Sequence, residues 1–227
     1  MRNIRIAPGE HYHIFNRGSN KQIIFLDDTD RVRFLFLILY FQSPTILQNI
    51  GRPVRHFVKH SVFNIERDIE REIVDKRFVE VLGFCLMPNH FHLIIKEVEE
   101  GGISQYMQRV LNAYTKYFNT KYKKSGHLFQ GPYRAVHVKD NRQLLHLSAY
   151  IHKNPREIKG WVDNEEKYKW SSYQDFISEN RWDDLLVPTL ISKQFKNKDE
   201  YKKFVKTSPA KMLKKELEEL SPIYKDL

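Results

Sequence analysis

The sequence predicts an α+β domain in which an antiparallel sheet carries helices on one face. Segments with the two-residue period of a strand and segments with the spacing of a helix alternate in the order strand, helix, hairpin, helix, strand, helix. The hairpin fills residues 78–97, where two apolar segments are joined by Pro88-Asn89. This order fits the ferredoxin-like (RRM-like) arrangement.

The first half of the chain predicts one strand, one buried helix and an insertion. Residues 11–16 alternate between two faces. Residues 31–40 are apolar on most sides, which predicts a buried helix capped by Asp28 or Asp30. Residues 44–77 are irregular at first and then charged, with isoleucines at every fourth position. We interpret them as an insertion that carries a short surface helix.

The second half predicts two helices and a further strand. A helix with an apolar stripe follows Gly101-Gly102, and Ser104 is the expected cap. Residues 133–138 alternate as a strand. Asp140, with a glutamine three residues later, opens a helix over residues 141–153.

The composition indicates a globular chain with a polyanionic partner. The 227 residues are 41% hydrophobic, and 38 basic against 28 acidic residues give a formal net charge of +10. That balance favours nucleic acid first and an anionic membrane surface second. The longest apolar run, residues 32–41, is too short to cross a bilayer. The single cysteine, Cys85, lies among apolar strand residues, which predicts a core position in a cytoplasmic protein.

Two histidines on the predicted hairpin mark a candidate site. His90 and His92 are two residues apart on one strand, so both imidazoles leave one face while Phe91 and Leu93 leave the other. Two nitrogen ligands at this spacing suit a single divalent metal. The alternative is a pair of core histidines, although their apolar neighbours supply no hydrogen-bond partners. Metal or phosphate chemistry needs a third group.

The helix over residues 141–153 is the expected source of that group. Tyr150 lies beside its apolar seam, and Asn154 follows one turn later, directly before the helix-ending Pro155. A tyrosine off the apolar stripe is ordinarily a surface residue. Beside a metal-binding face, a phenolate can attack phosphorus and the amide oxygen of Asn154 can complete the metal shell.

Several motifs together resemble a known family. They are Met87-Pro88-Asn89-His90-Phe91-His92-Leu93, Ser125-Gly126-His127-Leu128-Phe129-Gln130-Gly131 and Ala149-Tyr150-Ile151-His152-Lys153-Asn154-Pro155, supported by Tyr12-His13-Ile14, Asn16-Arg17-Gly18 and Trp170-Ser171-Ser172-Tyr173. Over residues 8–180 the chain resembles the single-tyrosine transposases of the HUH endonuclease superfamily. It is close to the IS200/IS605 transposases and closest in pattern to the REP-associated tyrosine transposases.

The resemblance implies an activity and a role for each site residue. His90 and His92 would hold Mg²⁺ or Mn²⁺, and Asn154, where relatives place a polar residue such as glutamine, would be the third ligand. Tyr150, preferred over Tyr114 on an apolar stripe, would attack single-stranded, hairpin-forming DNA. The products would be a 5′-phosphotyrosine and a free 3′-OH. Relatives exchange the tyrosine helix in a homodimer or act as monomers, and both arrangements stay open.

Basic residues that flank this site in sequence are the expected DNA contacts. Aromatic residues interleave with them, as expected where bases stack and phosphates are neutralised. The candidates are Arg109, Lys116, Lys121, Lys123 and Arg134. His146 and His152 are expected to be phosphate contacts or surface residues.

The domain organisation follows from the same patterns. We expect a core over residues 1–160, with the insertion at 44–77, and a C-terminal helical extension over residues 161–227. Helical patterns in the extension lie at 195–204 and 212–220. The extension is expected to contact DNA or to cover an edge of the sheet.

Two other functions stay open on the sequence alone. A non-catalytic nucleic-acid-binding module is one, because ferredoxin-like sheets with aromatic residues also bind RNA. A metal-dependent hydrolase that activates a water molecule to cleave phosphodiesters is the other.

Overall fold

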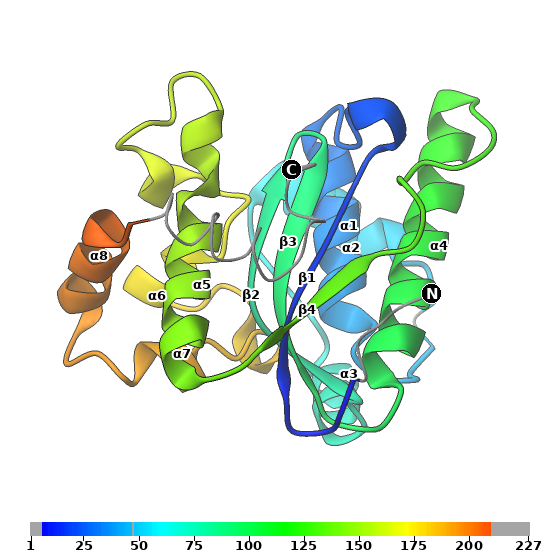
Figure 1. Cartoon of the computed structure of the whole chain (residues 1–227). Coiled ribbons are helices and arrows are strands. Elements are labelled where there is room, and N and C mark those ends of the chain that lie inside the picture. The colour runs from blue at the N-terminus through cyan, green and yellow to red at the C-terminus, as the bar shows by residue number, and fades with distance from the viewer. Residues whose placement is uncertain (1–5, 47, 210–227) are drawn as a thin grey trace.

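A four-stranded antiparallel sheet forms the centre of the computed structural model, which describes residues 6–46 and 48–209 (Figure 1). The strands lie in the order β2-β3-β1-β4. This order places β1 and β3 in the middle and confirms the ferredoxin-like prediction. The strands are β1 (His11–Arg17), β2 (Val79–Met87), β3 (His90–Glu97) and β4 (Arg134–Val138).

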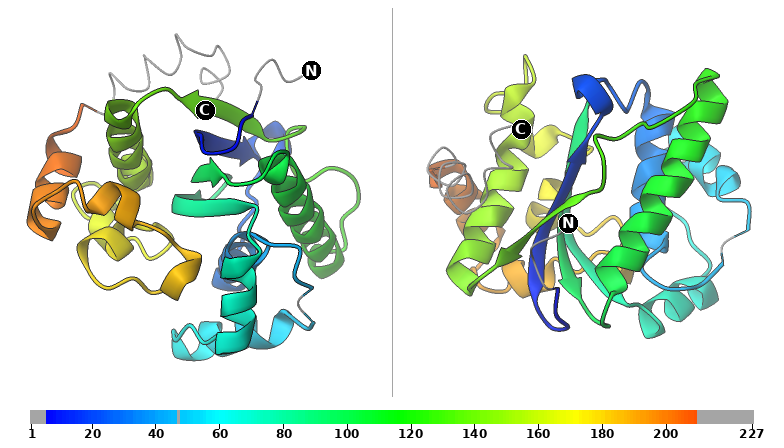
Figure 2. Two further views of the ribbon diagram at one scale, coloured as in Figure 1. Left: turned by 90° about the horizontal axis from the view of Figure 1, so that it is seen from below. Right: turned by 45° about the vertical axis from the view of Figure 1, so that its right-hand side comes forward.

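Two long helices pack on one face of the sheet. They are α1 (Asp28–Tyr40) and α4 (Gly102–Tyr122), and both lie on the same side in the views of Figures 1 and 2. Phe34 of α1 contacts both Phe91 of β3 and Tyr114 of α4, with ring centroids 4.9 and 5.0 Å apart. Aromatic packing therefore joins both helices to this face of β3.

The two expected caps at these helices are wrong, for reasons of local geometry. Asp27 caps α1, because its side chain accepts from the backbone N–H of Asp30 while the carboxylate of Asp30 accepts from that of Asp27. Asp30 is thus the reciprocal member of the capping box. Gly101, with φ of 80°, precedes the first turn of α4, so Ser104 lies inside the helix.

The opposite face of the sheet is covered by α5 (Asn141–Lys153) and the elements that follow it (Figures 1 and 2). Asp140 caps α5 as predicted, since its side chain accepts from the N–H of Gln143 at 2.7 Å. The later helices are α6 (Tyr173–Ile177), α7 (Thr189–Ser192) and α8 (Lys198–Thr207). The sequence had predicted helices on one face only, so this second layer is an addition to that prediction.

The C-terminal segment continues the hydrogen bonding of the sheet beyond its β2 edge. The N–H of Leu86 donates to the carbonyl of Trp170 at 2.9 Å, and the N–H of Ser172 donates to that of Phe84 at 2.9 Å. An edge strand with unpaired backbone groups invites aggregation, and this segment satisfies some of them. The predicted role of covering a sheet edge is therefore seen in the structure.

The insertion forms two short helices and packs against the extension. They are α2 (Gly51–His60) and α3 (Arg67–Asp75). Trp182 of the extension is fully buried, and its ring contacts Phe57 and Phe63 of the insertion with centroids 5.5 and 5.4 Å apart. The short 3-10 helices are η1 (Ser19–Lys21), η2 (Asn154–Glu157), η3 (Glu165–Lys167) and η4 (Asp183–Leu185). The helix expected at 212–220 lies outside the described residues.

No helix in the described part of the chain is both long enough and apolar enough to cross a membrane. The core is continuous across both faces of the sheet and includes Cys85, which is fully buried as predicted.

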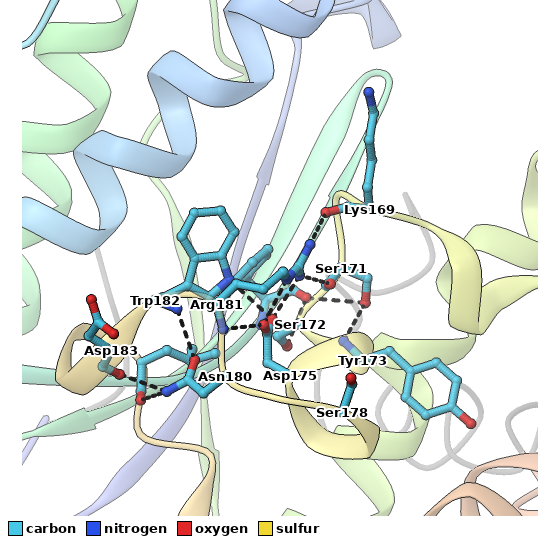
Figure 3. A network of polar contacts seen from close by, with 12 residues as sticks. Lys169, Ser171, Ser172, Tyr173, Asp175, Ser178, Asn180, Arg181, Trp182 and Asp183 are labelled. Atoms are coloured by element: carbon cyan, nitrogen blue, oxygen red, sulfur yellow. Dashed lines mark hydrogen bonds and ion pairs between the residues drawn. The ribbon is translucent and has the colours of Figure 1, made fainter. Parts of the chain in front are cut away.

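A buried carboxylate organises the segment that covers the β2 edge (Figure 3). Asp175 accepts from Nε and Nη2 of Arg181, both at 2.8 Å, and from the indole N–H of Trp182 at 3.1 Å. Arg181 also donates to the backbone carbonyls of Lys169 and Ser171. The Asp175–Arg181 pair therefore links three parts of the fold. They are α6, the segment from Lys169 to Ser171 at the β2 edge, and Trp182, which packs against the insertion.

This network predicts a large loss of stability for Asp175→Ala. The substitution leaves a guanidinium and an indole N–H without their acceptor, so the free energy of unfolding should fall by about 3 to 5 kcal/mol in urea denaturation. Asp75→Ala is the matched control, because Asp75 forms its ion pair with Arg71 in solvent. It should change stability by less than about 1 kcal/mol. Equal effects would contradict the assigned role of the buried pair.

Candidate functional site

The two histidines of the motif share one face of β3, the face that α5 covers. His90 is 5% exposed and His92 is fully buried, and their ring centroids are 5.0 Å apart. In the register of the central strands, His90 lies opposite Arg17 and His92 lies opposite Phe15. Phe91 lies in the core on the other face, as the two-residue period predicts.

Tyr150 lies beside this histidine pair. Its ring meets that of His92 edge-on, with centroids 5.7 Å apart, and only 7% of the residue is exposed. The ring of His13 on β1 lies 6.2 Å from the same phenol. The structure therefore brings together an imidazole pair from β3 and a phenol from α5, both supplied by one chain.

A neighbouring amide selects the tautomer of a neutral His90. The Nδ1 atom of His90 lies 2.7 Å from Oδ1 of Asn89, while Nδ2 of Asn89 donates to the backbone carbonyl of Lys21. Because the amide oxygen only accepts, Nδ1 of His90 is the donor. An imidazole protonated at Nδ1 offers the lone pair of Nε2, which is the form that binds metal ions.

His13 holds His92 in the same way, through Nδ1. The Nε2 atom of His13 lies 2.9 Å from Nδ1 of His92, and both residues are fully buried. Burial lowers the pKa of His13 to about 3, so this ring is neutral at physiological pH and can accept the proton of His92. Sequence reasoning assigned His13 no role. Its signal in the sequence was its place in the supporting motif Tyr12-His13-Ile14.

Asn154, the expected third ligand, follows α5 and is buried. Its Nδ2 atom donates to the backbone carbonyl of Tyr150 at 3.0 Å, whereas Oδ1 accepts no hydrogen bond within the described residues. This bond ties the Asn154 amide to the backbone of α5 one turn after Tyr150. Its oxygen is the atom with the chemistry of a metal ligand.

The donor set fits a divalent ion in an open site. The described ranges contain no group of three His, Cys, Asp or Glu residues placed to hold a metal. Two imidazoles and one amide oxygen would leave coordination positions for water and for phosphate oxygens, as in catalytic sites. A closed structural metal site does not fit these residues.

The five predicted DNA contacts separate into two groups. Arg109 donates to the backbone carbonyls of Ser43 and Thr45, and Lys121 pairs with Asp27 and Asp30 at 2.7 Å. These internal contacts give both side chains a structural role, and their contact with DNA stays a prediction. The other three, Lys116, Lys123 and Arg134, are exposed.

Among these five residues, only Arg134 lies on a strand, β4, and shares a face of the sheet with His90 and His92. We call this face the histidine face. Arg134 lies opposite Phe15, which in turn lies opposite His92. The α4 residues belong to the layer on the other side of the sheet. Closeness in sequence to the motifs does not show on which side of the sheet a basic residue lies, because α4 and α5 follow one another in the chain and pack on opposite faces.

Other sequence candidates take structural positions. Tyr114, the second choice as nucleophile, is buried under α1 and donates to the carbonyl of Ile24 at 2.5 Å. His152 is fully buried between the hydroxyls of Ser172 and Tyr201, at 2.9 and 2.7 Å. It therefore links α5 to the extension, and the expected phosphate contact is wrong. His146 lies 3.2 Å from the hydroxyl of Ser208.

Comparison with known proteins shows what this chain is similar to. Residues 54–154 match the family model described as "Transposase IS200 like", a segment that includes both site histidines, Tyr150 and Asn154. No curated protein matches the chain. A solved structure entitled "Structure of the REP associates tyrosine transposase bound to a REP hairpin" is similar with a TM-score of 0.51 and 16% sequence identity. The similarity covers 80% of this chain and 86% of that one, and at this identity it shows a shared fold.

The family segment and the site coincide. Every residue that the motifs assigned to chemistry lies inside the match, whereas β1, with His13 and Arg17, precedes it. Over this segment, which is less than half of the chain, the protein is similar to the IS200-like transposase family.

Proposed function

We propose that this protein is a transposase that cleaves and rejoins single-stranded DNA through a covalent 5′-phosphotyrosine at Tyr150. The observation that carries the proposal is the position of the Tyr150 ring, 5.7 Å from that of His92 on a face with two imidazoles. His90, His92 and Asn154 would hold Mg²⁺ or Mn²⁺. When bound, the ion would polarise a phosphate oxygen as a Lewis acid.

The proposed reaction conserves the phosphodiester. The phenol oxygen of Tyr150 attacks phosphorus, the bond from phosphorus to the 3′ oxygen breaks, and the phenol proton is balanced by the proton that the 3′-OH gains. Attack by a 3′-OH reverses the step and releases tyrosine. Rejoining therefore requires no nucleotide, and the sequence contains no Gly-x4-Gly-Lys-Ser/Thr phosphate loop.

Hairpin-forming DNA is the proposed substrate. A net charge of +10 favours a polyanion, and the similar solved structure is of a transposase bound to a hairpin. Lys116, Lys123 and Arg134 are exposed and are the proposed backbone contacts. This substrate fits the cytoplasmic location that the single cysteine indicates.

We propose that one chain supplies the whole site. The histidine pair and the tyrosine helix of the same chain already lie together, so cleavage needs no exchange of α5 between subunits. A monomer is the arrangement that this geometry favours over a helix-exchanged homodimer.

Tyr150→Phe should abolish the covalent adduct and preserve DNA binding. The variant keeps the buried ring and loses only the attacking oxygen. A denaturing gel of labelled single-stranded hairpin DNA with Mn²⁺ should show a protein–DNA band for the natural chain and none for the variant. Tyr114→Phe is the control: it loses the hydrogen bond to Ile24 and should still form the band.

The same gel separates the other functions. Cleavage that survives Tyr150→Phe would indicate a hydrolase that activates water. Binding that is indifferent to EDTA, with no cleavage by the natural chain, would indicate a non-catalytic module.

His13→Leu should weaken Mn²⁺ binding about 10- to 100-fold, because it removes the acceptor that holds Nδ1 of His92. His13→Gln can place an amide oxygen near the position of Nε2 and should restore part of the affinity. Phe15→Leu is the packing control, since Phe15 contacts the rings of His13 and His92 with no hydrogen bond between side chains. Isothermal titration with Mn²⁺ measures all three. Equal losses in His13→Leu and Phe15→Leu would refute a specific role for the acceptor.

A further inference from the structure

Arg17 is a buried cation next to the histidine pair. It is the last residue of β1 and lies opposite His90 in the pairing of the two central strands. Partners in register project to the same face of an antiparallel sheet, so the guanidinium shares the face of His90 and His92. The residue is only 8% exposed.

The Arg17 side chain has no partner among the described residues. It forms no hydrogen bond, ion pair or ring contact there, and its Nε atom is buried without an acceptor. The Nε atoms of Arg31 and Arg33 are also buried without an acceptor, but each of these side chains has another partner. Arg31 pairs with Asp28, and Arg33 lies over the ring of Tyr117. A buried guanidinium without an acceptor is unfavourable, so the fold accepts a cost at this position.

The backbone around Arg17 is fixed from two sides. Its carbonyl accepts from the N–H of Gln130 at 2.9 Å, and the N–H of Gly18 donates to the carbonyl of Asn89 at 2.8 Å. A Cβ at Gly18 would lie 2.2 Å from the carbonyl oxygen of Gln22, so only glycine fits there. The hairpin turn and the 127–131 segment thus hold the end of β1, and with it the base of the arginine side chain.

We propose that Arg17 binds the phosphate on which Tyr150 acts. This inference rests on the proposed function and adds an anion-binding residue to its site. A guanidinium beside a metal site would repel the ion unless an anion lies between them, and a phosphate supplies both positive groups with oxygen ligands. The planar donor fork of arginine matches two phosphate oxygens. In the reaction, Arg17 stabilises negative charge on the phosphate oxygens while the bond to Tyr150 forms.

The first test measures the stability of the full-length protein and its response to inorganic phosphate. Arg17→Met keeps much of the side-chain volume and removes the unpaired charge, so its melting temperature should equal or exceed that of the natural chain. Phosphate, compared with chloride at the same ionic strength, should raise the melting temperature of the natural chain and of the control Arg71→Met, which alters an exposed arginine on α3. It should not raise that of Arg17→Met.

Two results of this test would overturn the proposal. A strongly destabilised or unfolded Arg17→Met would mean that the arginine supports the fold. An equal response to phosphate in Arg17→Met and the natural chain would mean that the anion binds elsewhere.

The second test measures the chemical step. With hairpin DNA and Mn²⁺, Arg17→Met should form the Tyr150 adduct about 100-fold more slowly, and Arg17→Lys should recover part of that rate. Hairpin affinity in EDTA should change less than threefold in both variants. An adduct formed by Arg17→Met at the natural rate would refute the role of Arg17 and leave the proposed function intact. Absence of the adduct in the natural chain would refute the proposed function. The response of the melting temperature to phosphate would still show whether Arg17 binds an anion.

Discussion

The pairing of β1 with β3 is the constraint on which the site depends. Its register places His92 opposite Phe15 and His90 opposite Arg17, and the same pairing lets His13 reach Nδ1 of His92. Because side chains alternate along a strand, a slip of one residue would turn the β1 side chains to the other face. The hydrophobic face of β3, packed against α1 and α4, therefore fixes the position of the polar groups on its opposite face.

The sequence could predict the parts of this arrangement that depend on local periodicity. The order of the elements gave the ferredoxin-like sheet, and the spacing of His90 and His92 gave their common face. Asp140 was identified as a cap because its partner, Gln143, lies only three residues away. Tyr150 was chosen through its motif, since its position beside the apolar seam alone favours the surface, whereas the structure buries it.

The features that the sequence did not predict depend on contacts between strands and layers that are distant in sequence. Arg109 and Lys121 flank the motif along the chain, yet they make internal contacts on the side of α1 and α4. Arg17 and His13 belong to the supporting motifs, but their position beside His90 and His92 follows only from the register of β1 against β3. The second helical layer escaped prediction because the pattern of α5 shows an apolar seam without showing which face of the sheet receives it.

The polar groups buried on the histidine face give the contacts of the C-terminal extension a role in stability. His13, His92 and Arg17 are buried on the histidine face. Buried polar groups of this kind serve function and lower the stability of the fold. α5 closes this face, and His152 of α5 is held by hydroxyls of the extension. The extension is in turn held to the β2 edge by backbone hydrogen bonds and by the Asp175–Arg181 pair. Stability supplied at the edge thus keeps the tyrosine helix in place over a face that would be a poor core by itself.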